Sequence, residues 1–185
     1  MALKIGQQPD HGFDEPLGLL SDCHRRIEHF LNVLATIAGR GNGSALSVPE
    51  RAQLQEALTY FTIAAPKHTA DEEESLFPRL EAAGDESARH LLDVVQRLES
   101  DHREADAHHA AVDRLGRRWL AANMLSDEDV SELRLHLAHL AALYRAHIAI
   151  EDRELFPAAA RVLSASDVDA IGREMASRRS VPFKR

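Results

Sequence analysis

One eleven-residue phrase occurs twice in this chain and strongly limits what the chain can fold into. The first copy, HTADEEESLFP, begins at His68, and the second, HIAIEDRELFP, begins at His147. Six of the eleven positions are identical, including the histidine, a glutamate four residues later and the closing Leu-Phe-Pro. Residues four apart lie on one face of a helix. The phrase therefore predicts a helix that presents a histidine and a glutamate together.

The phrase belongs to a longer repeat. An apolar stripe with alternating steps of four and three residues leads into each copy, as on the inward face of a helix. The two stripes are Leu54, Leu58, Phe61, Ala65, His68, Glu72 and Leu133, Leu137, Leu140, Tyr144, His147, Glu151. The helices that precede them repeat at an offset of 78 residues, so that His24 corresponds to His102. We therefore expect two copies of a helical hairpin.

Start and stop signals divide the chain into helical segments. Ser47 and Ser126 are placed as N-caps, Gly84 and Asp85 are expected to separate the second helix from the third, and Ser166 and Asp167 to open a short fifth helix. Short connections between long helices are typical of an antiparallel, up-down-up-down arrangement. The predicted class is all-α, and the predicted segments are an arm at 1–15, a four-helix bundle at 16–165, and a short C-terminal helix with a basic tail at 166–185.

Three prolines fall inside these predicted helices. A proline has no N–H to donate, and its ring clashes with the preceding turn. We expect a kink at Pro66, and a bend or a helix end at Pro78 and at Pro157.

Composition excludes several classes of protein. With 185 residues and 44% apolar side chains the chain can bury one core, and low aromatic content favours helix over sheet. No apolar run is long enough to span a membrane. Cys23 is the only cysteine, which favours a cytoplasmic location. The net charge of −8, with its one basic cluster in the tail, argues against nucleic-acid binding, and that tail is interpreted as a solvated end.

The polar residues at the inner ends of the stripes predict a metal site. A carboxylate in a bundle core costs several kcal/mol unless it is paired or bound to a cation. Four imidazoles and two carboxylates are too many for one tetrahedral zinc ion, but they suit two ions of iron, manganese or zinc. The six candidate ligands are His24, His68, Glu72, His102, His147 and Glu151. A ferritin-like centre is disfavoured because that family places the glutamate first, in Glu-x-x-His.

At these residues the chain resembles the hemerythrin-like, or HHE cation-binding, family over about residues 16–160. The resemblance implies a non-haem diiron centre, with two irons joined by an oxo or hydroxo bridge, in a protein that binds or senses dioxygen or nitric oxide. Carried over to this sequence, His24 and His68 would bind one iron, and His102 and His147 the other. Glu72 and Glu151 would bridge the two.

One position departs from the oxygen-carrying members of that family, which have a fifth histidine four residues after the helix-three ligand. Here that position is Asp106, and its repeat partner is Glu28. Each is interpreted as an extra ligand, an acceptor that orients an imidazole, or a solvated acid. The departure makes simple oxygen storage less favoured, and the four-histidine set is more similar to iron sensors and iron-centre repair proteins.

Other side chains have two interpretations each. Glu73 is a terminal ligand or a solvent-facing acid, and Tyr144 lines the metal pocket or only packs in the core. His109 is expected to be a core histidine with a hydrogen-bond partner. His136 and His139 are expected to be structural or exposed.

Three functions remain open from the sequence. The first is binding or sensing of dioxygen or nitric oxide, and the second is iron storage, sensing or repair of iron centres. The third is a diiron oxidase, peroxidase or nitric oxide reductase, which is disfavoured because Tyr144 and His109 are the only polar groups positioned to orient a substrate and no electron-donor motif is present. The sequence specifies neither a redox partner nor an oligomeric state.

Overall fold

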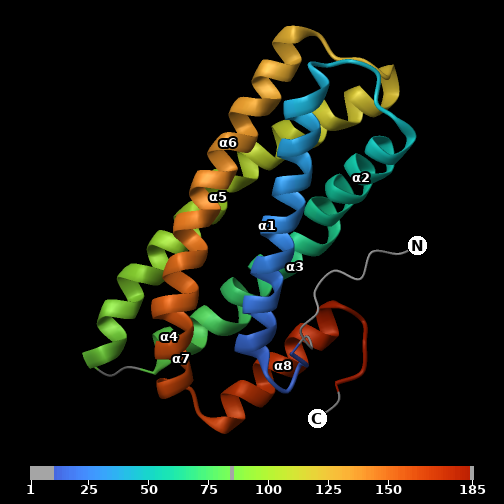
Figure 1. Cartoon of the computed structure of the whole chain (residues 1–185). Helices are drawn as coiled ribbons and strands as arrows, with labels where there is room; N and C mark the ends of the chain where they lie inside the picture. Colours follow the sequence, from blue (N-terminus) through green and yellow to red (C-terminus); the bar gives the residue numbers. More distant parts are fainter. Residues whose placement is uncertain (1–10, 84–85, 184–185) are drawn as a thin grey trace. The chain divides into compact units, whose positions relative to one another are not determined.

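The computed structural model describes residues 11–83 and 86–183, and all regular structure in these ranges is helical (Figure 1). The predicted all-α class is confirmed. None of the described helices is both long and apolar enough to cross a membrane. In chain order the elements are α1 (Pro16–Gly41), α2 (Val48–Thr59), η1 (Tyr60–Ala64), α3 (Ala65–Asp71), η2 (Glu72–Leu76), α4 (Phe77–Ala82), α5 (Glu86–Ala122), α6 (Asp127–Ile150), η3 (Glu151–Leu155), α7 (Phe156–Val162) and α8 (Ala165–Arg178).

Three helices, α2, α6 and α8, start at a capping serine. Ser47 forms a reciprocal capping box with Glu50 at the start of α2, and the Ser126 hydroxyl accepts from the Asp129 backbone N–H at 3.1 Å. The prediction for the last helix is wrong by two residues, because Ser164 and not Ser166 caps α8, through a capping box with Asp167. The predicted boundary at Gly84 and Asp85 lies outside the described residues.

The three internal prolines do not end their helices. Each follows a π-helical turn whose closing bond spans five residues: Ala65 N–H to Tyr60, Phe77 N–H to Glu72, and Phe156 N–H to Glu151. The wider turn makes room next to a residue that has no N–H and a bulky ring. The predicted helix ends at Pro78 and Pro157 are therefore not observed. Two of the three π turns begin at the candidate ligands Glu72 and Glu151.

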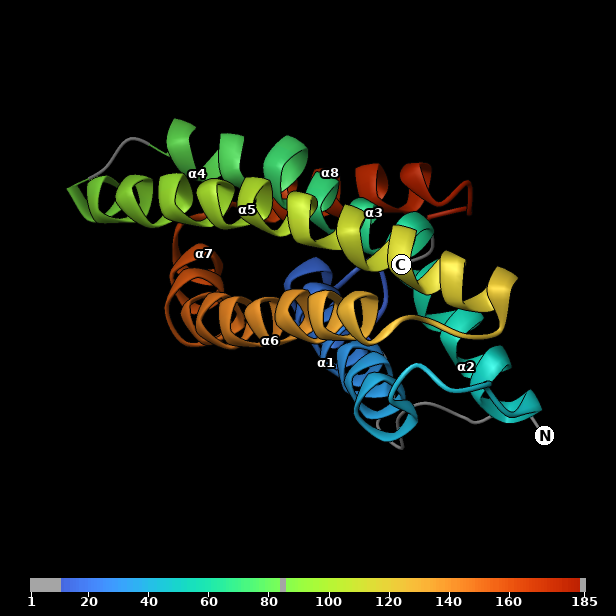
Figure 2. The ribbon, with the colours of Figure 1, turned by 90° about the horizontal axis from the view of Figure 1, so that it is seen from above.

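The described chain divides into two compact units. One unit contains residues 27–66 and 98–148, and its helices share a core. The predicted stripes supply part of this core, and Trp119, fully buried, donates its indole N–H to the Ser44 carbonyl at 3.0 Å. Within this unit α1 and α6 lie side by side in both ribbon views (Figures 1 and 2), and the Arg134 Nε donates to the Ala38 carbonyl at 2.8 Å.

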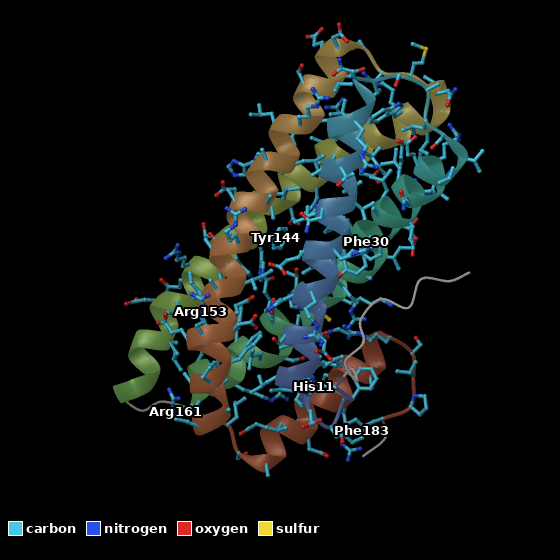
Figure 3. The ribbon with its side chains drawn as sticks, viewed as in Figure 1. His11, Phe30, Tyr144, Arg153, Arg161 and Phe183 are labelled. Carbon is cyan, nitrogen blue, oxygen red and sulfur yellow. The ribbon has the colours of Figure 1, made fainter. Side chains whose placement is uncertain are left out.

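The other unit contains residues 1–26, 67–97 and 149–185. Its first described residue is His11, labelled in Figure 3. The His11 backbone N–H donates to the buried Asp22 carboxylate at 2.6 Å. Helix α8 buries Ile171 and Met175, and Gly172 is necessary there because a Cβ atom would lie 1.9 Å from the Phe13 carbonyl oxygen.

The interpretation of the basic tail as a solvated end is wrong for two of its arginines. Arg178 and Arg179 bind the carboxylate of Asp71, which is fully buried, at 3.0 and 2.7 Å. The physical reason is that a buried carboxylate needs cationic or hydrogen-bonding partners. Arg173 pairs with Asp169 at the surface, and Lys184 and Arg185 lie outside the described residues.

Candidate metal centre

Four of the six predicted ligands meet inside one unit. His24 comes from α1, His68 from α3, Glu72 from η2 and Glu151 from η3. Each offers one ligand atom, and these atoms all lie within 4.8 Å of one another. The two glutamates have no exposed surface, and the histidines are 2% and 4% exposed. The set is therefore a compact, water-excluded group of metal-ligating side chains.

The spacing of the repeated phrase produces this geometry directly. His68 Nε2 lies 3.3 Å from Glu72 Oε1, one helical turn further along. His24 Nε2 lies 3.0 Å from Glu151 Oε2. The imidazoles of His24 and His68 meet edge to face, with ring centroids 5.1 Å apart. Nitrogen and oxygen atoms thus converge on one small volume.

The electrostatics of the group favour a bound cation. Burial, and then the negative charge of Glu151, raise the pKa of Glu72 well above its usual range. Burial alone would lower the pKa of His24, but hydrogen bonds to Asp152 and Glu151 and the charges of Glu151 and Glu72 outweigh it and raise the pKa to about 10. The negative charge of Glu151 contributes to both shifts, after burial for Glu72 and after hydrogen bonding for His24. A metal ion would supply the missing positive charge.

A further carboxylate orients one of the imidazoles. Asp152 Oδ1 lies 3.0 Å from His24 Nδ1 and accepts a hydrogen bond from the Ser21 hydroxyl at 2.8 Å. Burial would raise the pKa of Asp152, but the hydrogen bonds from His24 and Ser21 and the charge on His24 hold it below its usual value. With Nδ1 engaged in this way, His24 presents Nε2 toward Glu151. The arrangement matches that of metal-ligating histidines, which donate their second ring nitrogen to an acceptor.

Apolar packing fixes the ligand-bearing turns. The Phe156 ring stacks on the His24 imidazole with centroids 5.5 Å apart. Leu76, Phe77 and Leu155, which belong to the two Leu-Phe-Pro sequences, are buried as well.

The remaining two predicted ligands lie in the other unit. His102 and His147 are buried, at 7% and 1% exposure, and their ring centroids are 4.8 Å apart. His147 Nδ1 lies 3.3 Å from Asp101 Oδ2. This pair therefore repeats two features of the first group, namely two facing imidazoles and a carboxylate on the Nδ1 atom of one of them.

The donor chemistry fits a transition-metal ion. Imidazole nitrogens together with carboxylate oxygens suit iron, manganese or zinc. Calcium and magnesium prefer ligand sets made of oxygen alone. The residues that would hold an ion in the first unit are His24, His68, Glu72 and Glu151.

The additional candidates are less closely involved. Glu28 and Asp106 are exposed, as the interpretation as solvated acids expects, and Glu73 is half-buried. Tyr144, labelled in Figure 3, is buried. Its hydroxyl lies 2.9 Å from Nε2 of His109, which gives His109 the hydrogen-bond partner that was predicted.

Sequence reasoning missed the carboxylates Asp101 and Asp152. Each is next to a candidate ligand in the sequence, because Asp101 precedes His102 and Asp152 follows Glu151. Position alone could not identify them, because many solvated acids are also next to a candidate ligand.

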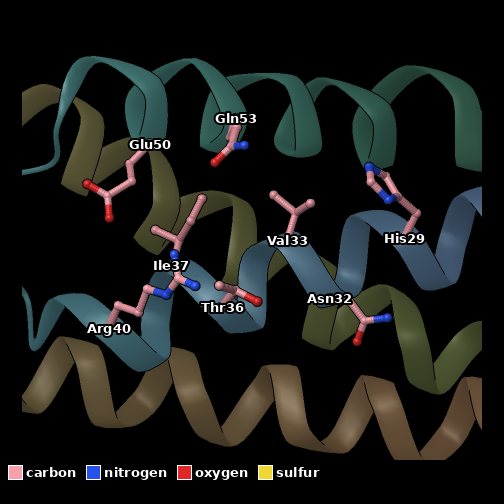
Figure 4. Close-up of a pocket in the computed structure, with 8 residues that line it drawn as sticks. All are labelled: His29, Asn32, Val33, Thr36, Ile37, Arg40, Glu50 and Gln53. Atoms are coloured by element: carbon pink, nitrogen blue, oxygen red, sulfur yellow. The ribbon is translucent and has the colours of Figure 1, made fainter. Parts of the chain in front are cut away.

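A separate pocket of about 240 Å³ lies between α1 and α2 (Figure 4). Its lining is mostly polar, and apart from Val33 and Ile37 it consists of His29, Asn32, Thr36, Arg40, Glu50 and Gln53. None of its lining residues belongs to a group of metal-ligating side chains found among the described residues. We assign it no part in the metal chemistry.

Comparison with known proteins agrees with this site. A protein of Haemophilus influenzae, described as uncharacterized, is 27% identical over 174 residues, which cover 91% of this chain and 92% of the relative. The family model of the hemerythrin HHE cation binding domain matches residues 15–159. That range includes all six predicted ligands. The chain therefore belongs to the hemerythrin HHE cation-binding domain family.

Proposed function

We propose that this protein is a non-haem diiron protein that binds or senses dioxygen or nitric oxide. The observation that carries the proposal is the buried group of two imidazoles and two carboxylates within 4.8 Å. Family membership supports a bound cation, and the internal repeat supports a second one.

We assign the ligands by the repeat. His24 and His68 would hold one iron, and His102 and His147 would hold the other. Glu72 and Glu151, one from each copy of the repeated phrase, would supply the carboxylates shared by the two ions. The matched imidazole pairs, with centroids 5.1 and 4.8 Å apart, support this assignment.

Two ferrous ions would supply electrons and open coordination positions for a diatomic gas. The protein's own contribution is to orient ligands and exclude water. Asp152 and Asp101 lie within hydrogen-bonding distance of the Nδ1 atoms of His24 and His147. The Nε2 atoms of these two imidazoles would then face the ions. The buried side chains of Leu98 and Leu140 precede His102 and His147 on their helices and provide an apolar surround. Asp106, in place of a fifth histidine, favours sensing over bulk oxygen storage.

The test is the optical response of the anaerobically purified, reduced protein to each gas. We expect a new visible absorption band after dioxygen or nitric oxide is added, and no such band in Glu151→Ala. Asp113→Ala, which removes a half-buried carboxylate paired with Arg117, is the matched control and should respond like the wild type. A metal-loaded protein with no spectral response to either gas would contradict gas binding.

Iron sensing or storage is the second candidate, and the buried charge of Glu72 and Glu151 favours it. Since these carboxylates lack exposed surface, folding should depend on metal occupancy. This function would be favoured if the metal-loaded protein shows no optical response to either gas but its melting temperature falls markedly when the metal is removed.

A further inference from the structure

A second group of potential ligands lies in the unit formed by residues 27–66 and 98–148, outside the two copies of the eleven-residue phrase. Glu104 and His108 come from α5, and His139 comes from α6. Their ligand atoms all lie within 4.8 Å of one another. Glu104 and His139 are exposed and His108 is half-buried, so the group is open to solvent.

The contacts in this group are close. His139 Nε2 lies 2.5 Å from Glu104 Oε1, and the imidazoles of His108 and His139 stack with centroids 3.9 Å apart. A third imidazole adjoins them, because His108 Nδ1 lies 2.8 Å from Nδ1 of His136. The helical spacing places the ligands in pairs, with Glu104 one turn before His108 and His136 one turn before His139.

Three adjacent imidazoles would repel one another if they were protonated. Burial, and then the charges of His139 and His136, lower the pKa of His108. The lowered pKa favours the uncharged ring of His108, which has a lone pair to offer a metal ion. The carboxylate of Glu104, in the same group, would partly neutralise the positive charge of that ion.

We propose that Glu104, His108 and His139 bind a divalent late transition-metal ion, zinc or copper(II), with His136 as the fourth ligand. These ions prefer imidazole, and zinc accepts four mixed nitrogen and oxygen ligands. Metal–nitrogen bonds of about 2.0–2.1 Å place neighbouring tetrahedral ligand atoms about 3.4 Å apart. Glu104 and His139 are exposed, which leaves their side chains room to adjust toward that spacing. The site is independent of the proposed diiron function and shares no residue with it.

The test is calorimetric titration of the iron-loaded full chain with Zn²⁺ alone. We expect the wild type to bind one zinc equivalent. His108→Ala and His139→Ala should each weaken binding by more than the roughly 10- to 100-fold that loss of an outer-shell partner costs. His29→Ala, which removes an exposed histidine of α1, is the matched control and should bind zinc like the wild type. Equal isotherms for the wild type and both cluster variants would overturn the site.

Two further measurements separate this site from the buried centre. Glu151→Ala should still bind zinc at this surface group, because Glu151 is not one of its ligands. Loss of surface zinc in Glu151→Ala alone would contradict the assignment. With Cu²⁺, electron paramagnetic resonance should show splitting from several nitrogen ligands in the wild type and from one fewer in His136→Ala. An unchanged spectrum in His136→Ala would remove His136 from the ligand set.

Discussion

Asp152 Oδ1 lies 3.0 Å from Nδ1 of His24, although the two residues are 128 positions apart in the chain. This contact joins α1 to the π turn η3 and decides which nitrogen of His24 faces Glu151. The repeated phrase therefore supplies an orienting group as well as a ligand, because Asp152 directly follows Glu151.

Asp152→Ala should weaken iron binding without removing a ligand. Loss of the partner of an imidazole typically costs about 10- to 100-fold in metal affinity. Competition with a graded series of chelators would measure the change. Asp113→Ala, a surface carboxylate paired with Arg117, is the control. Equal iron retention in the two variants would show that Asp152 does not orient a ligand.

Removal of the metal should lower the melting temperature markedly. A ligand that binds only the folded state stabilises it by about 3–4 kcal/mol at 100 to 1,000 times its dissociation constant. Without the ion, Glu72 and Glu151 remain buried beside each other. Calorimetry before and after chelation measures the effect, and an unchanged melting temperature would contradict it.

Glu151→Gln tests whether the buried carboxylates destabilise the metal-free protein. Burial is the main reason that the pKa of Glu72 is raised, and the charge of Glu151 is the next; replacing Glu151 with a neutral amide of similar shape removes the second cause. We expect the metal-free variant to melt at a higher temperature than the metal-free wild type, while it loses metal affinity. If the metal-free variant melts lower, buried charge is not the source of the instability.

His109 should make the protein sensitive to acid. Burial, and then the charge of His108, lower its pKa from 6.5 to about 4. Between these two pKa values His109 is protonated in the unfolded chain and neutral in the folded protein. His109 therefore leaves the free energy of unfolding unchanged above pH 6.5. As the pH falls from 6.5 toward 4, protonation of the unfolded chain lowers the free energy of unfolding by up to about 3 kcal/mol. His109→Gln should flatten this part of the pH dependence of the unfolding free energy, whereas His29→Ala should leave it unchanged. A slope that persists in His109→Gln would assign the acid sensitivity to other groups.

The Asp71 contacts predict a graded loss of stability. Arg178→Ala/Arg179→Ala leaves a buried carboxylate without its cations and should cost about 3–5 kcal/mol. Arg173→Ala removes a surface pair with Asp169 and a contact with the Phe183 ring, 4.6 Å from the guanidinium carbon, and should cost no more than about 1 kcal/mol. Chemical denaturation measures both. Similar losses in the two proteins would mean that the Asp71 contacts are no stronger than surface pairs.

Local patterns in the sequence predicted much of the fold. The apolar period identified buried Leu54, Leu58 and Leu137, and it placed His68 and Glu72 on one face. The Ser47 capping box was also readable, because it depends on residues only three apart. Each of these features is decided within a few turns of one helix.

Contacts between distant residues could not be predicted in the same way. Arg178 and Arg179 reach Asp71 across more than 100 residues, and no local pattern marks that pairing. His136 and His139 were expected to be structural or exposed, and their proximity to His108 depends on how α5 and α6 pack. The prolines signalled a disturbance, but whether it is a kink, a helix end or a π turn depends on tertiary packing.

The most direct measurement of the central claim is the metal content of the anaerobically purified chain by elemental mass spectrometry. The wild type should retain two iron ions per chain, and a folded Glu72→Ala/Glu151→Ala variant should lose them. Circular dichroism would confirm that the variant remains helical. A wild type without bound metal, or a folded variant with the same iron content as the wild type, would contradict the claim that this buried group is a metal centre.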